Sequence, residues 1–528
     1  MFARGMKALA LICVLVACRP KARSGMPEIA PSDRPHLVVL LVIDQLPAWA
    51  FAAKRSALTG GFDRLLREGE WHTGQYPSPA TLSSPGHALL GTGEPPASSG
   101  ILANEWWDRP QGRMVRSVED PIAGVSAHWL RVPGLGDSIA AARTGAKAVS
   151  VSLTDRAAIL PLGHAGTAIW YDKAAIAFTS NAPLPWLADH ARTHPISAHL
   201  QDVWTPLDRA KLAELAGVTD DEPGEVGERG FGPSFPHALA DTKDPADAVF
   251  AAPIGNELVL ETALAAIDGE HLGSDAAADL LVISLSAHDD VGHGWGHESW
   301  EAWDMMLRLD EQLGRFLASL DAKVGANKWT MIVTSDHGAS PMPERLHGGR
   351  ITFESLIDAA NRAASTELGA GSWIASAKYP TIFLTAAANG KPAKDRALVF
   401  KKILLALRSY PGIERAGRTA DFAGHCDKRT GEALAICLML DPARSGELFY
   451  VPRAGWIFET EAEPLATSSG SLQPSDREVP VILAAPGRHA HPPLALPDAA
   501  TIAMVQIAPI LAHWLAVTAP TELPRPPK

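Results

Sequence analysis

The chain has no basic tract of the kind that binds nucleic acid, although it has 528 residues and a formal net charge of −12. This argues against nucleic acid as the main partner. A small anionic substrate stays compatible with the charge, because bound metal ions can outweigh it locally. The chain also lacks internal repeats. Its composition, 46% hydrophobic and 20% charged, is that of a globular protein with one large domain and an insertion, or with two domains.

Long hydrophobic runs are scarce, and the run at the start of the chain, Ala8–Ala17, is too short to span a bilayer as a permanent helix. Arg4 and Lys7 precede it, as in a signal peptide. Residues 1–18 are therefore expected to be an export signal, and residues 19–34, rich in Pro, Arg, Lys and Ser, a flexible tether.

The end of that run, Leu15-Val-Ala-Cys18, resembles a bacterial lipobox, in which Cys18 is lipidated and becomes the first mature residue. An ordinary signal peptide with an incidental cysteine is the alternative. No Asp follows Cys18, which favours an outer-membrane anchor facing the periplasm over retention in the inner membrane. Membrane contact is expected only through this anchor.

Cysteine is rare, and beyond the lipobox only Cys426 and Cys437 belong to the body of the expected mature protein. An exported protein can oxidise them to a disulfide. The segment between them has the composition of a hairpin turn. Two buried free thiols remain the alternative at this stage.

Apolar runs alternate with amphipathic segments along the chain. The runs read as buried strands and the segments as helices. This alternation predicts an α/β sandwich with a mainly parallel sheet. The expected strands are His36–Ile43, Lys147–Leu153, Asp279–Ser286, Trp329–Ser335 and Val479–Ala485, and the expected helices are Gly61–Gly69, Glu298–Leu320, Lys394–Ser409 and Thr501–Val517.

Two regions depart from this alternation. Residues 105–275 are rich in Pro, Trp and Gly, which predicts a cap insertion, and residues 370–460 can form a second subdomain. The domain that contains both regions is expected to span residues 35–520.

Metal-type side chains follow three of the expected strands: Asp44, Asp289 with His293, and Asp336 with His337. Open α/β sheets place their sites at the carboxyl ends of strands. Any one of these segments is equally well explained by helix caps or turns, which favour Asp. Their joint occurrence favours a metal site.

The local sequences around these residues strengthen that interpretation. They resemble the alkaline phosphatase superfamily, and within it the branch of type I phosphodiesterases and nucleotide pyrophosphatases. The resemblance runs from about residue 36 to 517 and implies an α/β/α sandwich with a cap insertion. It is carried by Val-Ile-Asp44-Gln, Thr81-Leu-Ser-Ser-Pro-Gly-His87, Asp289-Asp-Val-Gly-His293 and Thr334-Ser-Asp336-His337-Gly.

The resemblance implies two zinc sites. Asp44, Asp336 and His337, together with the nucleophile, match the ligands of one zinc, and Asp289 with His293 match two ligands of the other. Carboxylate oxygen and imidazole nitrogen are suitable zinc ligands.

The resemblance also assigns the residues that handle phosphate. Ser83 matches the nucleophile, which forms a phosphoseryl intermediate. Asn104 and Arg156 match the groups that hold the phosphate oxygens. His87 is interpreted as a structural turn histidine.

Two positions depart from the family pattern. Ser469, in Thr467-Ser-Ser-Gly-Ser471, stands where the last zinc-ligand histidine is expected, and Thr154 replaces a lysine expected two residues before Arg156. A hydroxyl is a poor zinc ligand, so the second site is weakened unless His297 or His347 substitutes. The missing lysine puts a preference for monoesters over diesters in doubt.

The predicted function is an exported, metal-dependent hydrolase of small phosphate esters, either monoesters or diesters. The alternative is a catalytically weak or inactive relative that serves as a binding lipoprotein. Sulfate-ester chemistry is disfavoured, because no Cys-x-Pro-x-Arg segment is present. The sequence carries no indication of oligomeric state.

Overall fold

The computed structural model describes residues 29, 31–486 and 501–523. The predicted signal peptide and the proposed lipid attachment at Cys18 lie outside the described residues, as does most of the tether. Its last residues are described, and Pro31–Asp33 forms a 3-10 turn.

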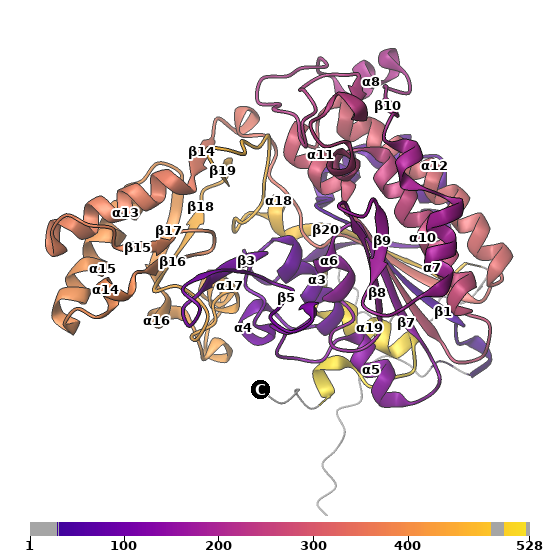
Figure 1. Ribbon diagram of the computed structural model, residues 1–528, viewed down its shortest axis with the longest axis horizontal. Coiled ribbons are helices and arrows are strands. Elements are labelled where there is room, and N and C mark those ends of the chain that lie inside the picture. Colours follow the sequence, from indigo (N-terminus) through magenta and orange to yellow (C-terminus); the bar gives the residue numbers. More distant parts are fainter. Residues whose placement is uncertain (1–28, 30, 487–500, 524–528) are drawn as a thin grey trace, which may run out of the picture.

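A nine-stranded sheet forms the centre of the molecule (Figure 1). The five strands in its middle are parallel to one another, as the alternation of strands and helices predicted. Antiparallel pairing occurs only toward the two edges of this sheet. In sheet order, the strands are β21 (Thr501–Ala503), β2 (Gly69–Gln75), β20 (Glu478–Ala484), β13 (Trp329–Thr334), β1 (Leu37–Ile43), β12 (Asp279–Leu285), β7 (Ala148–Ser152), β8 (Thr167–Asp172) and β9 (Ala177–Ser180).

Helices cover both faces of this sheet, so the fold is the predicted three-layer α/β/α sandwich. All seven residues of β1 are buried, and alternate side chains enter different cores. Val39 and Leu41 pack with one helix layer, and Val38 and Leu40 with the other. The first layer contains α2 (Gly61–Arg67), α10 (Pro253–Glu270) and α12 (Trp300–Lys323), and the second contains α3 (Ser83–Thr92), α5 (Leu135–Ala142), α6 (Asp155–Ile159) and α19 (Ile507–Trp514).

The region expected as an insertion, residues 105–275, is only partly outside the sheet. It supplies β7, β8 and β9 to the sheet and α10 to one helix layer. Shorter elements fill the rest: β3 (Glu105–Asp108), β4 (Arg113–Arg116), β5 (Glu119–Asp120), β6 (Gly124–Val125), α7 (Pro185–Thr193), β10 (Val203–Trp204), α8 (Arg209–Ala216), β11 (His237–Ala238) and α9 (Pro245–Ala248).

The prediction of one closing helix over Thr501–Val517 is wrong in its first part. Residues Thr501–Ala503 form β21 and pair with β2, and the helix covers only Ile507–Trp514. The apolar residues of this segment recur with a helical period. The edge of β2, however, has backbone N–H and C=O groups without hydrogen-bond partners, and residues Thr501–Ala503 pair with them.

A separate subdomain follows β13 and has its own hydrophobic core (Figure 1, in orange). Its four-stranded sheet has the order β15 (Ile374–Ser376), β16 (Thr381–Leu384), β18 (Leu448–Pro452) and β17 (Ile413–Arg418). Further elements are β14 (Gly349–Thr352), α13 (Phe353–Leu368), α14 (Ala386–Asn389), α15 (Ala393–Arg408), α16 (Thr419–Phe422) and β19 (Trp456–Glu459).

Cys426 and Cys437 form a disulfide with an S–S distance of 2.00 Å, so the pairing alternative is confirmed. The predicted hairpin between them is wrong. The segment forms a 3-10 turn and then α17 (Gly431–Met439), because the apolar run after Thr430 packs one face into the subdomain core.

Among the described residues, no single helix is both long and apolar enough to cross a membrane. One bent pair, Pro245–Ala251 with Pro253–Glu270, has the length and composition to do so.

Candidate active site

A cavity of about 870 Å³ opens at the carboxyl ends of the central strands. The sequence-predicted residues that line it are Ser83, Asn104, Arg156, Asp289, His293, His337 and Ser469. Asp44 and Asp336 follow β1 and β13 and are fully buried. The parallel pairing of β1 with β12 and β13 therefore brings the three ligand segments together.

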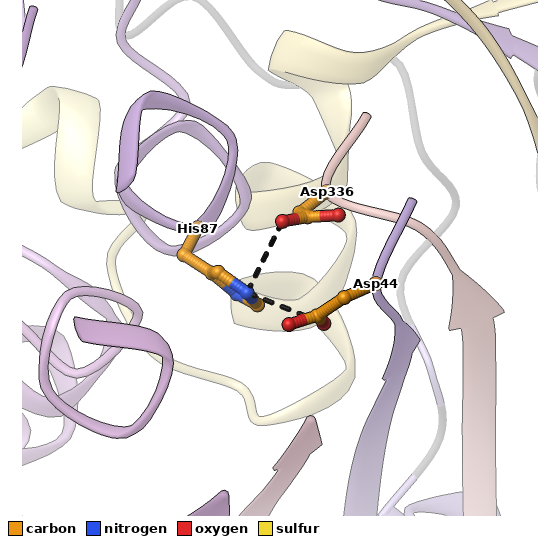
Figure 2. A group of neighbouring side chains, drawn as sticks. All are labelled: Asp44, His87 and Asp336. Carbon is orange, nitrogen blue, oxygen red and sulfur yellow. Dashed lines mark ion pairs between the residues drawn. The ribbon is translucent and has the colours of Figure 1, made fainter. Parts of the chain in front are cut away.

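Asp44, Asp336 and His87 form the first group of metal-type side chains (Figure 2). Nε2 of His87 lies 3.4 Å from Oδ1 of Asp44 and 3.4 Å from Oδ2 of Asp336. The hydroxyls of Ser284 and Ser286 donate to the two oxygens of Asp44 at 2.7 and 2.9 Å. These hydrogen bonds fix the orientation of the carboxylate.

Asp336 keeps one oxygen available. Its Oδ1 accepts from the backbone N–H groups of Gln45 and His337 at 3.0 and 2.9 Å, whereas its buried Oδ2 has no hydrogen-bond donor. His337 donates from Nδ1 to the carbonyl of Gly338, which leaves Nε2, 3.6 Å from Oδ2 of Asp336, free to coordinate. An orphaned buried carboxylate oxygen beside an oriented imidazole fits a bound cation.

The interpretation of His87 as a turn residue is wrong. It lies within α3 and is completely buried, and its ring contacts two of the predicted ligands. The spacing could have revealed this, because Ser83 and His87 are four residues apart and so share one helix face.

Asp289 and His293 form the second group and lie on α11 (Ala287–Trp295), also four residues apart. Nε2 of His293 is 3.5 Å from Oδ1 of Asp289. His293 donates from Nδ1 to the carbonyl of Thr467 at 2.9 Å, and the Gln45 amide donates to Oδ1 of Asp289 at 2.6 Å. The same Gln45 amide nitrogen is 3.0 Å from Nε2 of His293, so in this structure it contacts both atoms that would coordinate a metal. Asp289 and His293 provide only two ligands.

Ser469 does not act as the third ligand in this arrangement. Its hydroxyl donates to the carbonyl of Thr81, and the N–H of Gly470 donates to Oγ1 of Thr81 at 2.9 Å. These bonds tie the segment to the loop before the nucleophile. Neither proposed substitute lines the cavity: His297 is buried beside Gln45 and stacks on His288, and His347 is exposed in a turn.

Burial and neighbouring charges set the proton affinities of the first group. Burial and the adjacent Asp44 raise the pKa of Asp336 well above its usual value. Burial also works to raise the pKa of Asp44, but His87 and the two serine hydroxyls stabilise the anion and the net shift is downward. Burial lowers the pKa of His337 and so favours the neutral, coordinating form.

Ser83 is the first residue of α3 and is 2% exposed. The helix approaches the first group closely because residue 86 is glycine: a Cβ there would lie 2.1 Å from the carbonyl oxygen of Asp336. The N-terminus of a helix offers free N–H groups to an anion.

Asn104 and Arg156 face the same cavity as Ser83. Oδ1 of Asn104 accepts from the N–H of Ser84 at 2.8 Å, so the amide NH₂ is the end left to donate. Arg156 lies on α6, and its Nε is buried with no hydrogen-bond partner, which leaves this N–H able to donate to a bound anion. Thr154 is 3.4 Å from the hydroxyl of Ser286 and adds no charge.

Comparison with known proteins agrees with this geometry. The profile of the type I phosphodiesterase / nucleotide pyrophosphatase family matches residues 38–472. The chain belongs to this family. It is thereby also a member of the alkaline phosphatase superfamily, as the motifs predicted.

Several relatives carry the name alkaline phosphatase. PhoV of Synechococcus elongatus is 34% identical over 376 residues, which cover 66% of this chain and 68% of PhoV. PhoK of a Sphingomonas species is 29% identical, covering 92% of this chain and 89% of PhoK. The solved structure of wild-type PafA has a TM-score of 0.80 at 25% identity, covering 92% of this chain and 96% of PafA.

Family and relatives together establish this family member as a hydrolase of the phosphatase and phosphodiesterase type. The buried group of Asp44, His87 and Asp336 supplies a candidate metal site for such an enzyme.

Proposed function

We propose that the protein is an exported zinc enzyme that hydrolyses small phosphate esters through a phosphoseryl intermediate on Ser83. The observation that carries the proposal is that Ser83, Asn104 and Arg156 line one cavity together with Asp289, His293 and His337. The buried group of Asp44, Asp336 and His87 lies next to His337 and to the helix that begins at Ser83. The names of the relatives support the same substrate class.

Asp44, Asp336 and His337 would hold one zinc, and Asp289 with His293 a second, more weakly bound one. Zinc bound there would supply positive charge that stabilises the attacking and leaving oxygens of an in-line displacement. Ser284, Ser286 and Gly338 hold the ligands of the first site in place.

Side chains of the protein carry out nucleophilic attack and bind the phosphate oxygens. Ser83 Oγ gives up its proton to water and attacks phosphorus, the bond from phosphorus to the ester oxygen breaks, and the alcohol leaves after that oxygen takes up a proton from water. The Asn104 NH₂ group and the Arg156 guanidinium bind the non-bridging oxygens, which gain charge as the reaction proceeds. Water then cleaves the phosphoseryl bond and frees Ser83.

Trapping the intermediate tests this proposal. Acid quenching during turnover of an aryl phosphate is expected to leave phosphoserine on the peptide that contains Ser83, because phosphoserine is stable in acid. Peptide mass spectrometry provides the measurement, with the Ser84 side chain in the same peptide as the internal comparison. Phosphate on Ser84, or on neither serine despite rapid turnover, contradicts the mechanism.

Ser469 favours a second candidate, a weakly active protein that binds phosphate esters. In this alternative, the second site holds no metal, because it offers only two ligands. The cavity, Ser83 and Arg156 would then bind an ester without turning it over quickly.

We also propose that the protein is anchored to the outer membrane by a lipid on Cys18. The lipobox-like sequence supports this, and the Cys426–Cys437 disulfide suits an oxidising compartment. A Cys18→Ser variant is expected to lose the lipid and to move from the membrane to the soluble fraction of the cell envelope. The anchor is rejected if the wild type and the variant fractionate equally and their intact masses differ only by the exchange of Cys for Ser.

A further inference from the structure

We propose that a second pocket beside the active site binds the leaving group of the ester, and that this group is a flat, uncharged aromatic ring system. We call it the aromatic pocket and define it by Asn104, His293, Phe353, Tyr379, Phe458 and Ser469. This inference rests on the proposed function, since it names the substrate class of the same site.

The aromatic pocket has a volume of about 230 Å³, suited to one or two rings, and is continuous with the cavity of Ser83. The residues that line both spaces are Leu82, Asn104, His293, Glu463, Leu465, Ser468 and Ser469. His293 of the second metal group lines the aromatic pocket. The pocket therefore lies on the side of Asp289 and His293, where the leaving oxygen of an in-line displacement departs if Ser83 attacks from the side of the first group.

Three nearly parallel aromatic rings form one wall. Phe353 and Phe458 stack with ring centroids 5.8 Å apart and an interplanar angle of 22°, and Tyr379 and Phe458 stack at 5.5 Å and 25°. The Tyr379 hydroxyl donates to the carbonyl of Pro79 at 2.7 Å, which anchors this wall to the loop before the nucleophile. Rings preset in this way favour another flat ring over a puckered aliphatic one.

The charges around the aromatic pocket disfavour an anionic leaving group. Its polar lining contains the carboxylates of Glu105, Glu459 and Glu463 and one lysine, Lys378. Lys378 is paired with Glu105, and Glu459 is paired with Arg350 at 3.7 Å, so this lysine is not free to bind a second phosphate. A nucleotide joined through a pyrophosphate would bring negative charge toward the remaining carboxylate, Glu463.

Ser469 leaves the two spaces continuous. Its side chain lines both spaces, is small and is turned toward the Thr81 carbonyl, whereas the larger imidazole at this position would take up part of the shared volume. The departure that weakens the second metal site thus also enlarges the path from Ser83 to the aromatic wall.

Benzyl phosphate and cyclohexylmethyl phosphate provide the test, because their alcohols have similar acidity and size and differ in the flatness of the ring. The metal-loaded wild-type protein is expected to show a kcat/KM for benzyl phosphate about threefold to tenfold higher. Phe353→Ala is expected to remove this preference and leave inhibition by inorganic phosphate unchanged. Phe400→Ala removes a partly buried ring elsewhere in the same subdomain and is expected to keep the preference.

Binding of the non-hydrolysable benzylphosphonate and cyclohexylmethylphosphonate separates this inference from the proposed function. If the protein is inactive but binds benzylphosphonate more tightly, and Phe353→Ala abolishes the difference, the pocket is supported and the catalytic proposal fails. Equal binding and equal turnover of the two ring types by the wild-type protein overturn the pocket assignment. A preference that persists in Phe353→Ala overturns it as well.

Discussion

Replacing Ser83 by alanine is expected to lower kcat for aryl phosphate hydrolysis on the order of 10³-fold or more, because the variant has no oxygen to attack phosphorus. Binding of inorganic phosphate should persist, since Asn104 and Arg156 are untouched. Steady-state kinetics with a phosphate-inhibition series measure both quantities.

Ser84→Ala is the matched control for this change. The Ser84 hydroxyl is buried against the Ser117 hydroxyl at 2.7 Å, so its removal costs about 1 kcal/mol of stability but no reacting group. Hydrolysis should fall far less than in Ser83→Ala. Comparable rates in Ser83→Ala and the wild type would show that another group attacks phosphorus.

Restoring the missing imidazole with Ser469→His is expected to convert the second metal site into a three-ligand site. The number of zinc ions retained per chain after dialysis should rise from one to two, and kcat/KM at limiting zinc should rise about tenfold or more. Elemental analysis of the dialysed protein gives the first quantity and zinc-titrated kinetics the second.

Ser469→Ala is the control that separates the effect of adding a metal ligand from the effect of losing the hydrogen bond to Thr81. It removes the hydroxyl and adds no imidazole, so zinc content should stay at that of the wild type. If the dialysed wild type already holds two zinc ions, the second site is complete as it stands and the weak-binding alternative is refuted.

The sequence revealed the centre of the fold because its signals there are local. The runs that became β1, β12 and β13 are continuous and apolar, and the ligand residues follow them directly. The strand at Thr501–Ala503 was missed because it exists only through pairing with a distant edge strand. The helix at Gly431–Met439 was missed because turn residues before it outweighed its short apolar run.

The candidate site shows the same difference between residues with a local sequence signal and residues whose role depends on distant contacts. Asp44, Asp289, His293, Asp336 and His337 were predicted from their motifs, and the structure brings them to one end of the sheet. Gln45 was not predicted, although its side chain bonds Asp289 and contacts His293, because its role depends on a left-handed backbone at φ 59° and on packing against Gly292. Sequence patterns identify ligands more readily than the groups that orient them.

The strand that leads to Asp44 and the aromatic rings of the pocket belong to different hydrophobic cores. Leu40 and Leu41 of β1, which ends just before Asp44, pack in the cores of the central sandwich, whereas Tyr379 and Phe458 pack in the core of the subdomain. Substitutions in the subdomain can therefore alter which alcohols leave while the hydrolytic machinery keeps its geometry. The range of substrates can thus diversify through changes in one part of the fold, the subdomain.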